Sequence, residues 1–370
     1  MSQCEQHSTI EGRLESIDAL RGFDMFWIIG GGAIFASLDK IFNHPVTAFI
    51  SAQLEHAQWE GFTFEDIIMP LFLFIVGAAM PFSSGKRLAK GDTKKQIYIH
   101  AVKRSLILFF LGMIAQGNLL KYDLSKLHIY CNTLQTIAVG YLISTILLLE
   151  CRVVTQSIAV VFFLLLFWAL MALVPAPGYR AGDLTPEGNL AIYIDKSILG
   201  RFQDGSPYAW ILETPVFAAT VMLGVFAGQW LRSSRSAYEK FAGLVAGGLV
   251  TLALGQLWSY WFPNIKHLWT SSFVLFSGGL CYSLLAFFYF VIDVLGLRKW
   301  AFGFKVIGVN AIAVYMATEV FDFRKIGNVF VGGLVSRLGN WDDLVQQTAA
   351  FAIVWLILFY MYRKKTFIKV

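Results

Sequence analysis

The stretch IIMPLFLFIVGAA, residues 67–79, carries no charged side chain. It lies inside an apolar window, 63–84, that is long enough for a helix to cross a lipid bilayer, which takes roughly 20 residues. The sequence holds nine more windows of this kind: 17–38, 99–118, 130–150, 154–174, 211–231, 240–261, 269–294, 303–322 and 345–362. The pattern therefore predicts an all-α bundle of about ten transmembrane helices.

The segment 326–339 could raise the number of spans to eleven. Its glycines interrupt the apolar pattern at Gly327, Gly332, Gly333 and Gly339. Glycine weakens a helix, so we expect this segment to be re-entrant or interfacial rather than a full span.

The composition agrees with a polytopic membrane protein. Of the 370 residues, 57% are hydrophobic and 15% are charged, whereas soluble chains have about 45–50% and about 25%. This excludes a soluble multidomain enzyme and a disordered chain. The four cysteines are scattered and predict neither a disulfide framework nor a metal site. The net charge of +6 is what positively charged cytoplasmic loops produce, so we do not expect nucleic-acid binding.

The distribution of basic residues predicts the orientation. They gather after the second window and in the C-terminal tail: Lys86, Arg87, Lys90, Lys94, Lys95, Arg363, Lys364, Lys365 and Lys369. The positive-inside rule then puts both termini in the cytoplasm and the loops 40–62, 119–129, 175–210, 262–268 and 323–344 outside. We expect a cytoplasmic segment 1–16, a transmembrane domain 17–362 and a basic cytoplasmic tail 363–370. The long outer loop 175–210 is predicted to be an ordered cap or a substrate-facing element.

Several polar residues lie where the hydropathy pattern predicts membrane. Burying an ionisable side chain there costs roughly 2.5–3.5 kcal/mol on insertion scales, so each one needs a partner or a function. Asp18 and Arg21 are spaced to pair on one helix face, and Asp24 lies deeper in the same span. His56 precedes the 63–84 window in an outer loop, and Asp66 follows ten residues later. A carboxylate near His56 would orient its ring for general-base catalysis, but a solvated surface histidine fits the spacing equally well.

Other polar residues allow a structural and a functional interpretation. Lys103 and Arg104 could anchor the helix at the cytoplasmic boundary or bind an anionic cofactor. Gln135 and Asn310 could simply bridge helices by hydrogen bonds. Glu319, near the outer end of its span, falls roughly opposite Asn310 on an ideal helix, so the two need not share one cavity.

Two blocks of sequence resemble the heparan-α-glucosaminide N-acetyltransferase family and its bacterial NagX-type relatives. The members of this family are transmembrane acetyltransferases. The block RLESIDALRG at 13–22 is similar to the opening of that family. The block HAQWEGFT at 56–63, continued by Asp66, Pro70, Phe72, Phe74 and Gly77, is similar to the signature that carries its active-site histidine. Shorter blocks at 134–135, 268–273 and 308–312 follow in the same order.

The resemblance implies transfer of the acetyl group of cytoplasmic acetyl-CoA to an amino sugar, of glucosamine type, across the membrane. His56 would be the catalytic residue, either accepting the acetyl group itself or deprotonating the acceptor amine with both substrates bound. Asp66 would orient His56 or bind the acceptor. The remaining candidates are Arg21, Lys103, Arg104 and Gln135 for the coenzyme, and Trp59, Asp24, Asn310 and Glu319 for the acceptor. No metal is implied.

The same resemblance suggests a homodimer, and the small residues Gly243, Gly247 and Gly248 would allow close helix packing. One departure from the family is visible: lysosomal members carry a functional asparagine near the outer end of the first span, where this chain has IIGGG at 28–32. Because no large lumenal domain precedes the spans, we expect an acceptor other than heparan and a bacterial inner membrane as the location.

The alternative function is a proton-coupled transporter related to N-acetylglucosamine uptake. In that case the buried carboxylates Asp24 and Glu319, rather than His56, would be indispensable.

Overall fold

The computed structural model describes residues 14–368, which form an all-helical protein without a single strand in that range. The expected N-terminal segment 1–16 therefore lies mostly outside the described residues. The main helices are α1 (Glu15–Phe26), α2 (Gly32–Phe42), α3 (Pro45–Gln53), α4 (Ile68–Ala89), α5 (Lys94–Ala115), α6 (Thr133–Glu150), α7 (Val153–Leu173), α8 (Leu190–Leu199), α9 (Thr214–Arg232), α10 (Ala237–Trp258), α11 (Ser271–Tyr289), α12 (Phe302–Gly308), α13 (Ala311–Val320), α14 (Phe323–Val335) and α15 (Asp342–Arg363).

Short 3₁₀ or π-helical turns join or extend several of these helices. They are η1 (Trp27–Gly31), η2 (Phe64–Ile67), η3 (Leu119–Lys121), η4 (Gly200–Phe202), η5 (Lys266–Leu268), η6 (Phe290–Val294) and η7 (Gly339–Trp341).

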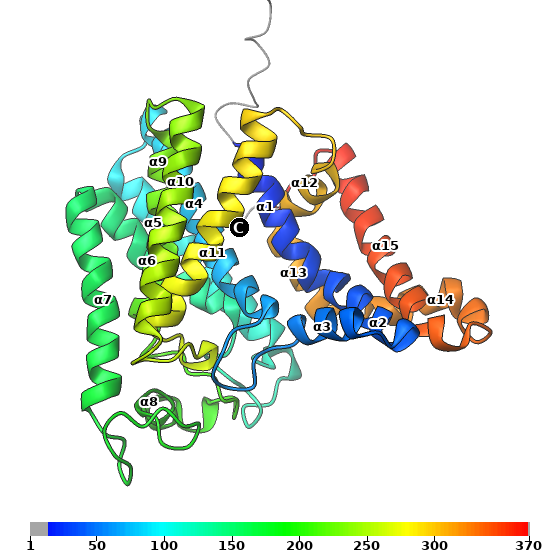
Figure 1. The fold of residues 1–370 in the computed structure, drawn as a ribbon, viewed down its shortest axis with the longest axis horizontal. Coiled ribbons are helices and arrows are strands. Elements are labelled where there is room, and N and C mark those ends of the chain that lie inside the picture. Colours follow the sequence, from blue (N-terminus) through cyan, green and yellow to red (C-terminus); the bar gives the residue numbers. More distant parts are fainter. Residues whose placement is uncertain (1–13, 369–370) are drawn as a thin grey trace, which may run out of the picture.

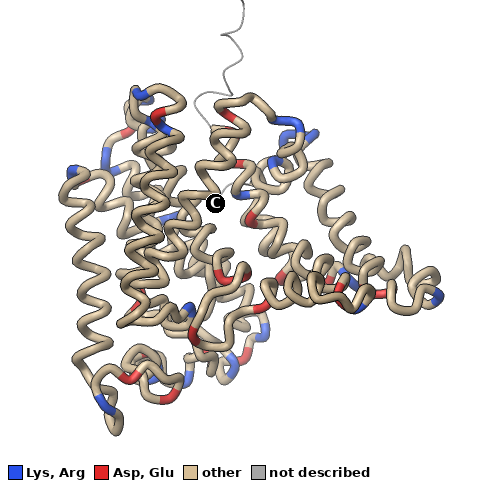
Figure 2. The backbone as a smooth tube through the Cα atoms, viewed as in Figure 1, with Lys and Arg blue, Asp and Glu red and all other residues tan. Residues whose placement is uncertain are grey.

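The predicted multi-pass membrane bundle is confirmed. Within the described residues, nine helical segments are long and apolar enough to cross a membrane, and the pair α12–α13 makes a tenth if its two halves are one span. Figure 2 places charged residues mainly toward the two ends of the bundle, as expected for helices whose middle lies in hydrocarbon.

Two spans are less regular than the hydropathy windows predict. The window 303–322 is divided into α12 and α13, which meet at 73°, because Asn310 leaves the helical conformation (φ −125°, ψ 31°). The window 17–38 contains the π-helical turn η1, where Gly30 has φ 138°. Only glycine adopts that conformation readily, so the glycine run of this window is used to redirect the chain.

The spans form two groups in Figure 1: α4 to α7 with α9 to α11, and α1 with α12, α13 and α15. In the first group, α4 and α9 pack backbone to backbone. A Cβ atom added to Gly77 would collide with the carbonyl oxygen of Val221, and one added to Gly224 would collide with that of Phe74. Small residues permit this close packing of two helices. As a result α4, the helix that follows His56, lies in the centre of the protein.

The glycines considered for dimer packing are used within the chain. Added Cβ atoms on Gly243 and Gly248 would meet Trp230 of α9 and Gly279 of α11, respectively. These residues therefore pack α10 against its own neighbours and supply no argument for a second copy.

Helices α2, α3 and α14 run crosswise to the spans at one end of the bundle (Figure 1). The segment 326–339 forms most of α14, whose 13 residues are too short to cross a bilayer. Ion pairs of Asp343 with Lys40 (2.7 Å) and Arg324 (3.1 Å) tie α2 and α14 to the start of α15.

The loop 175–210 covers the same end of the first group and contains α8. Its Asp195 is fully buried and accepts hydrogen bonds from the backbone N–H groups of Trp210 (2.8 Å) and Ile211 (3.0 Å). We call residues 189–211 the cap.

Candidate functional site

The loop before α4 fixes Asp66 beside His56. The backbone N–H of Thr63 donates to Oδ2 of Asp66 at 3.0 Å. Oγ1 of Thr63 lies 3.1 Å from the same oxygen, but its shorter hydrogen bond donates to the carbonyl oxygen of Glu55 at 2.7 Å. The backbone N–H of Ala57 donates to Oδ2 of Asp66 at 3.3 Å. These donors orient the carboxylate so that Oδ1 lies 3.1 Å from Nδ1 of His56. The sequence spacing could not show whether His56 and Asp66 meet, and the structure shows that they do.

A third residue, Lys266, completes the cluster. Its Nζ lies 3.1 Å from Nδ1 of His56 and 3.4 Å from Oδ1 of Asp66. Lys266 is 5% exposed, and Asp66 is fully buried. Burial lowers the pKa of Lys266, while the charge of Asp66 opposes that shift. The result is a buried ion pair between Lys266 and Asp66, and both side chains contact His56.

Contacts between two distant loops bring Lys266 to His56. Glu60 and Ile265 form an isolated β-bridge, and the backbone N–H of Gly61 donates to the carbonyl oxygen of Asn264 at 2.9 Å. Lys266 was missing from the predicted site residues. The available signal was a lysine two residues before the block at 268–273, in a loop, 262–268, with no other Lys, Arg, Asp or Glu.

The hydrogen bonds of Asp66 decide the tautomer that we assign to His56. Because Oδ2 accepts from the backbone N–H groups of Thr63 and Ala57, we assign Oδ1 as the acceptor for the ring, which then carries its proton on Nδ1. Lys266 donates to Asp66 rather than to the ring in this arrangement. In this tautomer Nε2 is the ring nitrogen that can accept a hydrogen bond, and the His56 side chain is 46% exposed.

His56 and Lys266 line a cavity of about 500 Å³ between the two helix groups. Its carboxylates are Glu65, Asp204 and Glu319, whereas Lys266 is its only ammonium group among the described residues. The full lining consists of Ile28, His56, Glu65, Ile68, Met69, Phe72, Gln116, Cys131, Thr133, Leu134, Ile137, Asp204, Ser206, Tyr208, Trp210, Lys266, Tyr315 and Glu319. The cavity is therefore acidic and partly aromatic. Cys131 is a poor nucleophile there, since burial raises its pKa to about 12.

His267, next to Lys266, lies in a row of aromatic rings. It stacks on Trp59 (centroids 5.0 Å apart, 17° between planes) and contacts Tyr208 (4.4 Å). Burial and the nearby charge of Lys266 lower the pKa of His267 to about 4 from a usual 6.5. The folded protein therefore resists protonating this ring.

This shift predicts a pH effect on stability. Between pH 6.5 and pH 4 the unfolded chain binds a proton at His267 that the folded chain refuses, so stability falls with acidification, by up to about 3 kcal/mol in total. The His267→Phe variant keeps a stacking ring and loses this titration. Melting temperatures of both proteins from pH 4 to 8 should diverge below pH 6.5, with the wild type falling further. Parallel curves would contradict the assignment.

The residues expected to bind the acceptor are not all in one place. Glu319 lines the cavity. Trp59 lies beside it and donates from Nε1 to the carbonyl oxygen of Leu184 at 2.9 Å. Asp24 is fully buried in α1, and neither of its oxygens has a hydrogen-bond partner among the described residues.

Asn310 is placed away from the cavity. Its Nδ2 donates to the carbonyl oxygen of Thr366 (3.2 Å), and its Oδ1 accepts from the backbone N–H of Ile368 (2.9 Å). Its amide is thus occupied by the C-terminal segment, at the break between α12 and α13.

The residues expected to bind the coenzyme are also spread over several elements. Arg21 pairs with Asp18 at 3.2 Å, as predicted from their spacing. The guanidinium of Arg104 lies over the ring of Tyr141, 4.5 Å from its centre. Gln135 is fully buried and bonds backbone groups of Ile129 and Cys131 just before α6.

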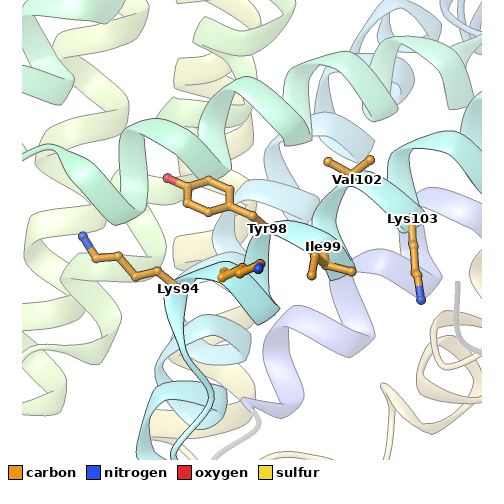
Figure 3. Close-up of a pocket in the computed structure, with 6 residues that line it drawn as sticks. Lys94, Tyr98, Ile99, Val102 and Lys103 are labelled. Atoms are coloured by element: carbon orange, nitrogen blue, oxygen red, sulfur yellow. The ribbon is translucent and has the colours of Figure 1, made fainter.

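Lys103 belongs to a basic surface on α5. Figure 3 shows the side chains of Lys94, Tyr98, Ile99, Val102 and Lys103 along this helix. With Lys95 they line an open hollow of about 650 Å³. Lys94 pairs with Glu150 at 2.8 Å, so Lys95 and Lys103 are the lysines on this apolar wall that can hold an anionic group with an organic body.

Comparisons with known proteins identify distant relatives of this chain. A family described as a domain of unknown function (DUF5009) matches residues 13–176. The chain is 27% identical over 426 aligned residues to the human heparan-alpha-glucosaminide N-acetyltransferase, with 98% of this chain and 61% of the human protein covered. It is 25% identical to the mouse protein of the same name, over 100% of this chain and 62% of the mouse protein. The chain thus spans about three-fifths of these relatives and is distantly related to them.

Proposed function

We propose that this multi-pass membrane protein is an acetyl-CoA-dependent N-acetyltransferase that acetylates an amino sugar of glucosamine type. The observation that carries the proposal is the His56–Asp66–Lys266 cluster, which opens into an acidic cavity. The distant relation to named N-acetyltransferases supports the reaction class.

In the proposed reaction both substrates are bound together. The acceptor arrives as a free amine, after losing one proton to solvent. Its nitrogen attacks the carbonyl carbon of the thioester, so a C–N bond forms while the C–S bond breaks. Nε2 of His56 takes the second proton from the nitrogen and passes it to the sulfur of the leaving thiolate. Asp66 holds the ring in the tautomer that this requires.

Lys266 has a separate task in this scheme. The attack places negative charge on the carbonyl oxygen, and an ammonium group fixed in a cavity with little water stabilises such charge strongly. Lys266 lines the cavity beside His56, and Asp66, 3.4 Å away, favours its charged form against the effect of burial. We assign it to the developing oxyanion.

The charges of the cavity suit the acceptor. Glu65, Asp204 and Glu319 attract an amino sugar, which is cationic in solution, and can accept hydrogen bonds from its hydroxyl groups. Cys131, buried and weakly acidic, takes no part. We keep Glu319 as an acceptor-binding residue and leave Asn310 out of the site because its amide is occupied.

We propose that the coenzyme enters from the opposite, cytoplasmic end. Lys95 and Lys103 are the groups on α5 that we assign to its phosphates, because Lys94 pairs with Glu150 at 2.8 Å. The positive-inside rule predicts that the end with the basic loops is cytoplasmic. A bacterial inner membrane and a homodimer remain part of the proposal.

Free-thiol release from acetyl-CoA tests the proposal on purified protein. We expect release that continues only while glucosamine is present, with N-acetylglucosamine as product. Release of one equivalent without acceptor would instead indicate an acetylated His56 as an intermediate. Absence of both turnover and coenzyme binding in folded protein would overturn the proposal.

A proton-coupled sugar transporter remains the second candidate, because of Asp24. A buried carboxylate without a hydrogen bond is costly to keep in a membrane unless it has a use. One variant distinguishes the transporter from the acetyltransferase. Asp24→Asn should abolish pH-driven sugar uptake by a transporter, whereas an acetyltransferase should retain glucosamine-dependent thiol release.

A further inference from the structure

The end of the cap, residues 204–210, forms one wall of the cavity that holds His56 and Lys266. Asp204, Ser206, Tyr208 and Trp210 all line it. None of them belongs to the blocks that carry the family resemblance. Their role therefore has to be inferred from the structure.

Two of these residues continue the aromatic row that starts at Trp59. Beyond His267, Tyr208 lies 5.8 Å from Trp210 with 29° between the ring planes. Trp210 in turn lies 5.8 Å from Tyr130. At these distances and angles the rings overlap in a stack. We call the part of the stack that lines the cavity the platform, and the C–H groups on one face of a pyranose can pack against it.

The backbone of this stretch is held from two sides. The N–H of Ala209 donates to the carbonyl oxygen of His267 at 3.0 Å, and the N–H of Trp210 donates to Asp195 at 2.8 Å. The first bond couples the platform directly to the loop that carries Lys266. The ring positions are thereby fixed relative to the catalytic cluster.

Trp210 also offers an unused polar group. Its side chain is 5% exposed, and its Nε1 has no hydrogen-bond partner among the described residues. Indole N–H groups are normally bonded when buried. A ligand hydroxyl group that reaches this nitrogen would satisfy the donor.

We propose that Tyr208 and Trp210 form the acceptor subsite, with the ring of an amino sugar packed on Tyr208 and one of its hydroxyl groups bonded to Trp210. This inference rests on the proposed function and names the acceptor class as a free hexosamine ring, in preference to a simple alkylamine. Asp204 borders the same wall and accepts from Ser206 Oγ at 2.8 Å, so its carboxylate is fixed as a further contact for the sugar. The subsite determines the KM for the acceptor and does not affect the KM for acetyl-CoA.

The test combines calorimetric binding of glucosamine to the detergent-solubilised protein with steady-state kinetics. Tyr208→Leu removes the ring, and we expect about tenfold weaker glucosamine binding and an equal rise in the KM for glucosamine, with the KM for acetyl-CoA unchanged. Tyr208→Phe keeps the ring and should bind more tightly than Tyr208→Leu. Trp210→Phe keeps a ring without the N–H and should also weaken binding. Tyr193→Leu, an exposed tyrosine of the cap that does not line the cavity, is the matched control.

The outcomes separate this inference from the proposed function. Wild-type turnover with an unchanged KM for glucosamine in folded Tyr208→Leu and Trp210→Phe would overturn the subsite while the acetyltransferase stands. Glucosamine binding that depends on Tyr208, without any turnover, would support the subsite and overturn the acetyltransferase. Equal kcat/KM for glucosamine and an alkylamine of similar basicity would overturn the preference for a sugar ring.

Discussion

Replacing His56 by glutamine is expected to lower kcat for acetyl transfer by a factor of about 10² to 10⁴. General-base catalysis contributes roughly this much, and glutamine cannot accept a proton from the attacking amine. The substitution should cost little stability, because the His56 side chain is 46% exposed. The measurement is steady-state thiol release, with the melting temperature recorded for each protein.

A second histidine, His44 between α2 and α3, supplies the control. His44 is exposed and accepts a hydrogen bond from the backbone N–H of Val46 at the start of α3. His44→Gln should retain wild-type kcat. A folded His56→Gln protein with wild-type kcat would remove His56 from the chemistry.

Replacing Lys266 by methionine is expected to reduce both activity and stability. Asp66 would remain buried without its ammonium partner, and breaking a buried ion pair from one side costs about 3–5 kcal/mol. Loss of the charge facing the developing oxyanion should lower kcat as well, by about 10² to 10³. Thermal unfolding and thiol release measure the two effects.

Two further variants keep this prediction testable if Lys266→Met folds poorly. Lys40 pairs with Asp343 but is 68% exposed in its side chain, so Lys40→Met should cost under about 1 kcal/mol. The double variant Lys266→Met with Asp66→Asn removes both buried charges. It should regain much of the stability and none of the activity. A double variant as active as the wild type would contradict the roles of both residues.

The sequence was sufficient for the spans because the requirement that fixes them is local. Each crossing needs its own apolar run, so windows such as 63–84 and 211–231 could be located without knowledge of their neighbours. The breaks were harder to predict. Asn310 looked like an ordinary polar residue inside one span, and its non-helical conformation follows from contacts with the C-terminal segment.

The site shows the same division between local and distant contacts. His56 and Asp66 are ten residues apart, and the resemblance drew attention to both. Lys266 is 210 residues from His56 and reaches it only because the loops at Glu60 and Ile265 pair. Tyr208 and Trp210 come from yet another loop. No spacing rule relates such residues, so the cluster became visible only in three dimensions.

Amide side chains illustrate a further difficulty. Gln135 and Asn310 were interpreted as possible ligand contacts or as structural hydrogen-bonding groups, and their residue types fit both roles. In the structure, backbone groups occupy both amides. Which role such a residue has depends on the partners that the fold supplies.

Acetyl transfer from one side of a sealed membrane to the other tests the proposed function most directly. Proteoliposomes with the cytoplasmic face of the protein outward would receive radiolabelled acetyl-CoA outside and contain glucosamine inside, with His56→Gln vesicles in parallel. We expect labelled N-acetylglucosamine to accumulate inside the wild-type vesicles and not inside the variant ones. Equal labelling in both preparations, or none in vesicles whose folded protein binds acetyl-CoA, would contradict a transmembrane acetyl transfer centred on His56.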